Sequence, residues 1–258
     1  MRIKNLIIAL LLISNKVFAT HQIPDYLIIG KDTLQIYSNP LELYFKNKKR
    51  PKIFNDSCFL TSCWRGYIAY FKVQNDSLFL VDVYDCCQND KKIELSKILT
   101  DRDVKKPIYA DWFTGIIMSP SGKLLNYIHM GYGSIYEKEI DYFFKKGILK
   151  YKKKHINRIV KSDFRDLNNL KQFFEDRVNW DSVPKIDTLT RVFIRVKADR
   201  RGKIIQKNIL KSDNELFNKE ALRLIEEIDT MPVLIVRENM LINSWTLAVS
   251  FDPRKRKK

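Results

Sequence analysis

The chain has 258 residues, of which 45% are hydrophobic and 30% charged, and it carries a formal net charge of +17 at pH 7. This apolar content excludes intrinsic disorder as the default expectation. The length fits one large domain or two ordinary ones, each with its own hydrophobic core. No apolar stretch after the N-terminal segment approaches the length of a membrane span, so we expect a water-soluble or peripherally bound protein.

The N-terminal segment, residues 1–19, has the pattern of a secretory signal peptide. Arg2 and Lys4 precede a short apolar run, and Val17 and Ala19 place small residues where signal peptidase cuts. We expect cleavage after Ala19 and export to the periplasm or cell envelope. The alternative is an uncleaved inner-membrane anchor, but the apolar run falls short of the ~20 residues that cross a bilayer.

Positive charge is concentrated in three runs, which are residues 46–52, residues 145–161 and the basic tail 254–258. The mature chain as a whole would carry +14. A basic chain often binds nucleic acid, but export argues against that partner, and we predict none. The runs fit peripheral contact with an anionic membrane surface, at roughly 1 kcal/mol per basic residue. They fit equally a solvated lysine-rich face that aids solubility, and the sequence leaves both open.

Four cysteines, Cys58, Cys63, Cys86 and Cys87, lie in one region of the chain. An even number in an exported chain favours disulfides, and cross-pairs between the first two and the last two would join neighbouring strands. A zinc site is the alternative, but the adjacent pair has poor spacing for zinc ligands. No cysteine precedes Cys58, which argues against a lipoprotein signal. We therefore expect disulfides or partly free thiols, name all four as disulfide candidates and predict no metal site.

Residues 20–155 are predicted to form a β-rich domain. Short runs of β-branched and aromatic residues are separated by turn signals, which is typical of strands joined in hairpins. The first pair is 26–29 with 33–37 across a Gly-Lys-Asp turn. The second pair is 66–73 with 78–83 across an Asn-Asp turn.

Two more hairpins and a helix are expected in the same region. Residues 113–118 would pair with 123–128 through Ser-Pro-Ser-Gly, and 136–144 with 148–152 through Lys-Gly. A helix is expected near 94–99. Several short strands at this spacing indicate a sandwich or a strongly twisted sheet.

Three short strings of this domain resemble those of uncharacterised exported bacterial proteins. The strings are Cys-Trp-Arg-Gly-Tyr at 63–67, Asp-Trp-Phe-Thr-Gly at 111–115 and His-Met-Gly-Tyr-Gly-Ser at 129–134. The resemblance supplies no function, so the role of this domain stays unassigned.

Residues 156–182 change character and are predicted to be a helical linker. Apolar side chains recur there at helical spacing among Lys, Arg, Asp and Asn, which is typical of an amphipathic helix. These side chains are Phe164, Leu167, Leu170, Phe173 and Phe174. Pro184 follows them and places a domain boundary near residue 182.

The segment after the linker begins with two strands. In 188–198, Val192, Ile194 and Val196 share one face, which is the two-residue period of a half-buried strand. An Asp-Arg-Arg-Gly turn follows, in which the glycine is free to adopt positive φ. Residues 203–210 return as the second strand.

A helix and a closing strand complete the segment. Asn218 is the predicted N-cap of a helix at 219–228. Its expected buried stripe is Ala221, Leu224, Ile225 and Ile228. Met-Pro then ends the helix, and a last strand follows in which large apolar residues alternate with small ones.

The D-x-x-G turn, the L-x-N-x-x-A-L helix start, the proline and the closing strand resemble the C-terminal domain of TonB in order and spacing. The resemblance covers residues 183–253 and implies an α+β fold, with a ββαβ module behind the β-rich domain. The sequence departs from the family at 232–243, where Val-Leu-Ile-Val replaces the usual tryptophan or proline and glycine. In that family the module binds the N-terminal peptide of outer-membrane transporters by adding a strand to its sheet edge.

The resemblance therefore implies an envelope protein as partner, such as an outer-membrane transporter peptide, bound along the last strand. The candidate residues are Ser244, Trp245, Thr246, Leu247, Ala248, Val249, Ser250 and Phe251. The four large apolar side chains among them are expected to form the core face. Binding would use the backbone and the other face.

Two alternatives to a non-catalytic binding protein stay open. A divergent TonB-type energy transducer would need the uncleaved anchor and a long Pro-rich spacer, whereas only eight prolines are scattered through the chain. An enzyme would use the cysteines or pair His129 with Ser134 as base and nucleophile. No third orienting group can be named, and no nucleophile or zinc motif occurs, so we predict no catalytic residues and no cofactor.

Overall fold

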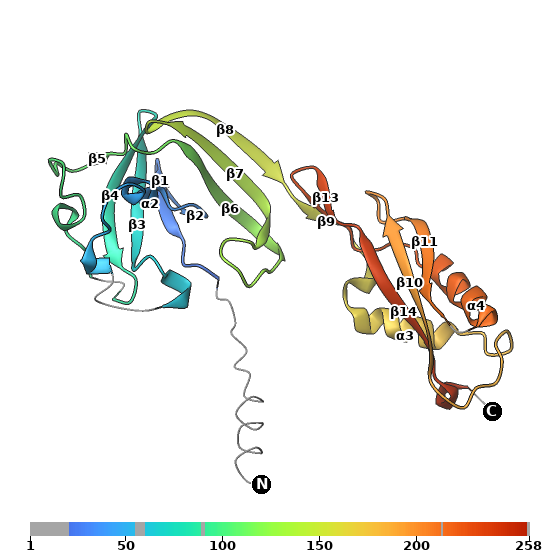
Figure 1. The fold of residues 1–258 in the computed structure, drawn as a ribbon. Coiled ribbons are helices and arrows are strands. Elements are labelled where there is room, and N and C mark those ends of the chain that lie inside the picture. Colours follow the sequence, from blue (N-terminus) through green and yellow to red (C-terminus); the bar gives the residue numbers. More distant parts are fainter. Residues whose placement is uncertain (1–20, 55–59, 89–90, 213, 257–258) are drawn as a thin grey trace, which may run out of the picture. The chain divides into compact units, whose positions relative to one another are not determined.

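The computed structural model describes residues 21–54, 60–88, 91–212 and 214–256 (Figure 1). They form a mixed α and β protein, mostly sheet with few helices, which agrees with the predicted α+β class. The chain divides into two compact units at the junction of Lys154 and His155. The signal segment, Cys58 and the end of the basic tail lie outside the described residues. None of the helices in the described ranges combines the length and apolar character that crossing a membrane requires.

The first unit is built on an eight-stranded sheet with the order β2-β1-β3-β4-β8-β7-β6, in which β5 pairs with β4. β1 is parallel to β3, whereas β1–β2, β3–β4 and β6–β7 are antiparallel pairs. The strands are β1 (Asp25–Ile29), β2 (Asp32–Ile36), β3 (Tyr67–Gln74), β4 (Ser77–Asp85), β5 (Ile108–Tyr109), β6 (Gly115–Asn126), β7 (Ile135–Lys145) and β8 (Ile148–Ile156). The connections hold helix α2 (Pro40–Phe45) and the 3-10 turns η1 (Lys52–Phe54), η2 (Thr61–Cys63) and η3 (Leu95–Lys97).

Two predicted hairpins of this unit are confirmed, and the two strands expected on either side of the Gly-Lys-Asp turn pair as well. β1 turns into β2 at Gly30, which has a φ of +62°. β3 turns into β4 through Asn75 and Asp76, and β7 turns into β8 through Lys146 and Gly147, all four with positive φ. Two successive residues with positive φ define the type I′ turn, whose twist matches that of the strands it joins.

The predicted hairpin between 113–118 and 123–128 is wrong. One strand, β6, runs through this stretch and pairs with β7, with a register shift between Ser121 and Leu124. Gly122 has a φ of +77° at the shift, so it forms a bulge that bends the strand without reversing it. The helix expected near 94–99 is likewise only the short turn η3.

A continuous apolar cluster fills the first unit. Leu27, Phe71, Leu80 and Ile117 come from four different strands and are completely buried. Helix α2 adds Leu41, which is also completely buried. Any polar group enclosed by such a cluster needs an internal partner, because burying it without one is costly.

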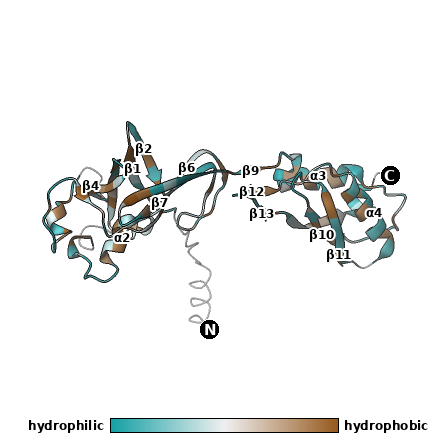
Figure 2. Cartoon of the chain, turned by 90° about the horizontal axis from the view of Figure 1, so that it is seen from above, coloured by the Kyte–Doolittle hydropathy of each residue, from teal (hydrophilic) through white to brown (hydrophobic). Residues whose placement is uncertain are grey.

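The second unit combines the sheet β11-β10-β14 with helices α3 and α4 (Figure 1). Both helices share one apolar core with the sheet, and Figure 2 shows apolar and polar residues mixed along α4, as expected for a helix with one packed face. A second small sheet has the order β13-β12-β9. The elements are β9 (Arg158–Ile159), η4 (Asp163–Arg165), α3 (Leu167–Arg177), β10 (Thr190–Ala198), β11 (Ile204–Lys211), α4 (Glu215–Glu226), β12 (Leu234–Val236), β13 (Asn239–Ile242), β14 (Ser244–Phe251) and η5 (Pro253–Lys255).

The predicted N-cap of α4 is wrong by one turn. Asn214 caps the helix, because its side-chain oxygen accepts a hydrogen bond from the Leu216 N–H at 2.8 Å. Asn218 lies inside the helix, and its own N–H donates to the Asn214 carbonyl at 3.2 Å. The predicted buried stripe is confirmed, since Ala221 and Leu224 are completely buried and the other two members nearly so.

The region predicted as a linker belongs to the core of the second unit. Its helix, α3, begins after Asp166, whose carboxylate accepts a hydrogen bond from the Asn168 N–H at 2.9 Å. Leu170 and Phe174 of this helix are buried in the same cluster as the β10 side chains. The divergent stretch 232–243 is ordered as well, because its apolar residues form the β12–β13 hairpin. The module is therefore ββα followed by a hairpin and then β14.

Candidate functional site

Strand β14, predicted to be the binding strand, lies at an edge of its sheet. It pairs with β10 in an unbroken antiparallel register from Ser244 opposite Lys197 to Phe251 opposite Thr190. In the part of the chain that the structure describes, no strand pairs with its other side. The geometry required for strand addition is therefore present.

The register shows which main-chain groups face the open edge. Beside β14, the Ala198 N–H donates to the Asn243 carbonyl at 2.9 Å. Hydrogen-bonded and non-bonded pairs alternate along an antiparallel ladder. The N–H and C=O groups of Ser244, Thr246, Ala248 and Ser250 consequently point away from β10.

The eight predicted residues fall into two sets by side chain. Leu247, Val249 and Phe251 are buried in the core of the unit, and Trp245 is half-buried against it, as expected. The side chains of the other four residues lie on the outer face of the sheet. All four are small and uncharged, and only Ser250 is partly covered.

Natural proteins protect sheet edges with charges, proline or bulges, because an open edge pairs readily with another chain. β14 has none of these features: it contains no charged residue and no proline, and its register is regular. β11, at the other edge, carries Lys207 and Lys211 and has two register shifts against β10. Lys207 also forms an ion pair with Glu226 of α4. Of the two edges, only β14 lacks these protective features.

The outer face of β10 carries three basic side chains, Arg191, Arg195 and Lys197, which we call the basic row. All three are exposed, and Phe193 lies half-buried among them. The row adjoins the small side chains of β14, with Arg195 opposite Thr246. Alternation in the sequence already places these side chains on the face opposite the core residues of β10, but the predicted contact surfaces are only the runs of consecutive charges, so this face carries no predicted role.

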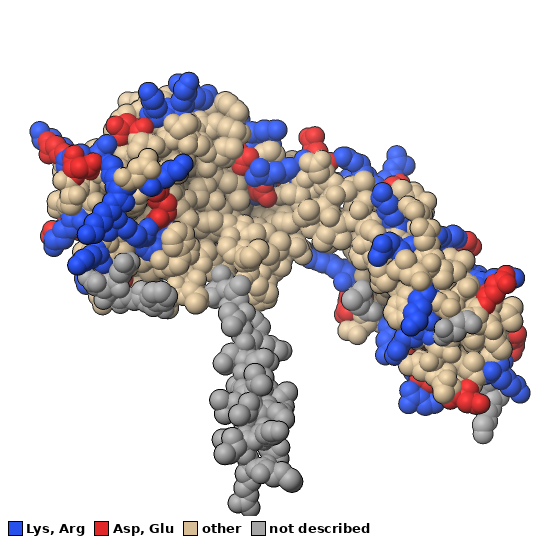
Figure 3. Space-filling model, in the orientation of Figure 1, with Lys and Arg blue, Asp and Glu red and all other residues tan. Residues whose placement is uncertain are grey.

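The three charge runs are distributed over both units of the chain. Figure 3 shows Lys and Arg side chains spread over both units on the face in view, with Asp and Glu among them. Peripheral contact with an anionic membrane surface therefore stays a prediction. The basic row differs from these runs because it lies on one strand and one face.

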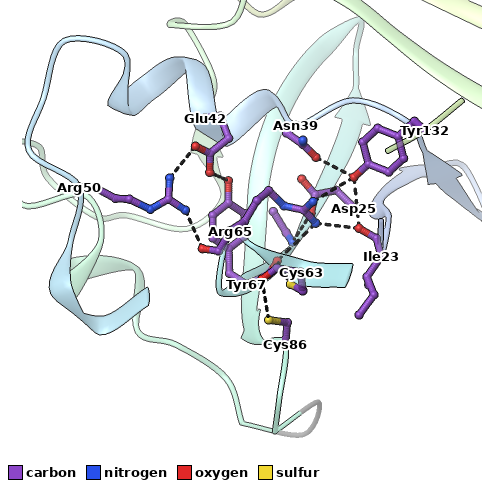
Figure 4. A network of polar contacts seen from close by, with 11 residues as sticks. Ile23, Asp25, Asn39, Glu42, Arg50, Cys63, Arg65, Tyr67, Cys86 and Tyr132 are labelled. Atoms are coloured by element: carbon purple, nitrogen blue, oxygen red, sulfur yellow. Dashed lines mark hydrogen bonds and ion pairs between the residues drawn. The ribbon is translucent and has the colours of Figure 1, made fainter. Parts of the chain in front are cut away.

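A buried polar network occupies the first unit (Figure 4). The side chains of Arg65 and Asp25 are both fully buried, and Arg65 Nη2 lies 3.2 Å from Asp25 Oδ1. Arg65 also donates to the Tyr132 hydroxyl at 3.0 Å and to the Ile23 carbonyl at 2.9 Å. Asp25 Oδ1 accepts a further bond from the Ala69 N–H at 2.9 Å. One guanidinium thus ties together the start of β1, the start of β3 and the loop before β7.

Burial sets the protonation of this network. It raises the pKa of Asp25 to about 6, although the Arg65 charge and the Ala69 N–H act in the opposite direction. Burial also raises the pKa of Tyr132 to about 12. Asp25 Oδ2 and Arg65 Nε have no hydrogen-bond partner among the described residues. The network is an enclosed structural anchor that the sequence does not reveal, since its members are widely separated in the chain.

The cysteine expectation is met only in part. Cys87 is disulfide-bonded, whereas Cys63 and Cys86 are buried free thiols, so the expectation of two cross-paired disulfides is wrong for these two and the alternative of partly free thiols holds. Each of these sulfurs donates to a backbone carbonyl, Cys63 to Tyr67 at 3.4 Å and Cys86 to Cys63 at 3.6 Å. Burial raises the pKa of Cys63 to about 12, so this thiol is held in its unreactive form.

The hydroxyl of Ser134, named as an alternative nucleophile, closes a loop. Its oxygen accepts from the Ile128 N–H at 3.2 Å and donates to the Ile128 carbonyl at 3.4 Å. His129 packs edge-on against the Tyr127 ring, with centroids 4.5 Å apart. These contacts give both residues a role in loop structure.

The chain matches no family model, no curated protein and no solved structure. Its resemblance to the TonB C-terminal domain therefore depends on the residues and spacings described above.

Proposed function

We propose that this protein is an exported, non-catalytic envelope protein whose second unit binds a protein partner by strand addition to β14. The observation that carries the proposal is the unprotected edge: eight uncharged residues in regular register, with one side unpaired in the described structure. Strand addition uses main-chain hydrogen bonds for affinity and alternate side chains for selectivity.

The energetics of such a contact are favourable but moderate. Ser244, Thr246, Ala248 and Ser250 each offer a main-chain donor and acceptor at the open edge. Each hydrogen bond contributes about 0.5–1.5 kcal/mol net. Several together support affinity without any change in the core side chains, which stay buried whether or not a partner is bound.

The envelope location rests on the signal-peptide pattern of residues 1–19. N-terminal sequencing of the protein from its native cell tests this part directly. A mature chain beginning at Thr20 supports export and removes the anchored-transducer alternative. A chain that retains the first nineteen residues contradicts it.

The binding step is tested by removing one outward N–H from the open edge. Ala248→Pro deletes that donor, and proline is tolerated on an edge strand when its missing N–H faces solvent. Ala248→Ser is the matched control, because it keeps the donor. The mature protein and both variants would be used to capture partners from envelope extract, and circular dichroism would verify that each variant is folded.

We expect the wild-type and Ala248→Ser proteins to retain the same specific partner and the folded Ala248→Pro protein to lose it. Retention of the partner by Ala248→Pro would show that binding does not use the β14 edge. Absence of any specific partner of the wild-type protein would also count against the proposal.

A further inference from the structure

The basic row lies one strand inward from the edge at which the partner strand is proposed to pair. Arg191, Arg195 and Lys197 alternate with core residues on β10, so their side chains share the outer face of the sheet. None of the three side chains forms a hydrogen bond or an ion pair with any described residue. These charges are therefore free to meet an external group.

The sheet itself offers the row no negative charge. Strands β10, β11 and β14 contain no aspartate or glutamate. Gln206 lies opposite Lys197 on β11, and Asn208 lies opposite Arg195, so the neighbours on that side are neutral. The local potential of this face is positive, and an anionic group placed on it gains attraction without displacing an existing partner.

The small side chains of β14 leave the row accessible from the open edge. Ser244 is opposite Lys197, Thr246 opposite Arg195, and Ser250 opposite Arg191. Neighbouring strands are about 4.8 Å apart, so an added strand would lie roughly 10 Å from β10. Long arginine and lysine side chains extend over short neighbours, and an acidic side chain of the added strand spans the rest of the gap.

Building on the proposed strand addition, we infer that the partner segment is acidic, with carboxylates at every second residue on the face that meets the basic row. Exposed ion pairs contribute about 0.2–1 kcal/mol each. Their main effects are on partner choice, register and association rate, and they weaken as salt increases. The main chain at the β14 edge would hold the strand, and the row would select its sequence.

The test uses three short extended peptides that differ only at every second residue. These positions carry glutamate in the first peptide, glutamine in the second and lysine in the third. Binding to the mature protein is measured by fluorescence anisotropy at low and high salt. We expect the glutamate peptide to bind about tenfold more tightly than the glutamine peptide, because three exposed pairs supply roughly 1.4 kcal/mol. The lysine peptide should bind most weakly, and added salt should reduce the glutamate advantage.

The double variant Arg191→Gln/Arg195→Gln tests whether the basic row causes the preference for glutamate. It should bind the glutamate peptide only about twofold more tightly than the glutamine peptide, because only the pair with Lys197 remains, while its affinity for the glutamine peptide stays at the wild-type level. Lys171→Gln/Lys219→Gln is the charge-matched control. These lysines lie on α3 and α4 and are exposed, so the preference for glutamate should persist.

The variant Ala248→Pro separates this inference from the proposed function. Equal binding of the glutamate and glutamine peptides, both lost in Ala248→Pro, overturns the acidic selectivity and leaves strand addition standing. A glutamate preference that survives in Ala248→Pro leaves the row as a charge site and overturns strand addition. Failure of every peptide, together with row-dependent binding to phosphatidylglycerol vesicles, assigns the row to a membrane surface and overturns the inference.

Discussion

In the first unit, the guanidinium of Arg65 is enclosed by Asp25, Tyr132 and a backbone carbonyl, and no part of its side chain is exposed. In the second unit, the main-chain groups of four β14 residues face outward with no described strand beside them. The first arrangement stabilises a fold, because an enclosed charge that loses its partner is expensive. The second leaves hydrogen-bonding capacity for another chain. Substitutions should therefore affect stability in one place and binding in the other.

The largest expected effect is on the stability of the first unit, through its buried ion pair of Arg65 and Asp25. Arg65→Ala leaves Asp25 buried without its partner and should lower the free energy of unfolding of the first unit by roughly 3–5 kcal/mol. Urea denaturation of the mature protein measures this loss. Lys97→Ala, which removes an exposed partner of Glu94, is the control and should cost less than about 1 kcal/mol. A small loss in Arg65→Ala would mean that the network is not a structural anchor.

The pH dependence of stability provides a second test of the buried network in the first unit. The pKa of Asp25 is about 6 in the folded protein against a usual value of 3.8, so the folded state binds this proton more tightly than the unfolded chain does. Its contribution to stability is then fully present below about pH 4 and is lost as the pH rises through 6.

Asp25→Asn should remove this contribution, which amounts to roughly 1–3 kcal/mol between pH 4 and 7. The measurement is the difference between wild-type and Asp25→Asn unfolding free energies across that range. A difference that does not change with pH would contradict the raised pKa.

A matched pair of substitutions compares the two edges of the small sheet. Ala248→Lys on β14 and Asn208→Lys on β11 place the same charge on the same outer face. Both should change stability by less than about 0.5 kcal/mol, since both sites are exposed. Only Ala248→Lys should weaken partner binding, by about tenfold, because lysine protects an edge against pairing. Equal effects on binding would remove the distinction between the edges.

The smallest expected effect concerns the enclosed thiols. Cys63 and Cys86 are nearly inaccessible, so iodoacetamide should label neither in the folded protein and both after denaturation. Mass spectrometry under non-reducing conditions measures the labelling of each cysteine. Rapid labelling of the native protein would show that the thiols are exposed, and a mass loss of two hydrogens at this pair would show a disulfide in place of the thiols.

The features that sequence analysis predicted correctly are local ones. The turn at Asn75 and Asp76 needs only residues that accept positive φ between two apolar runs. The β14 pattern needs only alternation of large and small residues. In both cases the information lies within a few neighbouring residues.

The features that it missed depend on distant partners. Ser-Pro-Ser-Gly resembles a turn, but pairing with β7 makes Gly122 a bulge. Asp25 and Arg65 are forty residues apart, and the residues around each of them do not identify the other as its partner. Asn214 and Asn218 are both good caps by type, and the structure places the helix start at the first. The edge position of β14 also depends on the order of three strands, which the pattern alone does not determine.

Amide hydrogen exchange of the mature protein with and without its captured partner tests strand addition at β14 most directly. The N–H groups of Thr246, Ala248 and Ser250 should exchange readily in the free protein and become protected when the partner binds. Those of Trp245 and Leu247, which face β10, should be protected in both states. Protection that appears at β11, or that leaves the three outward amides of β14 unchanged, would contradict the account.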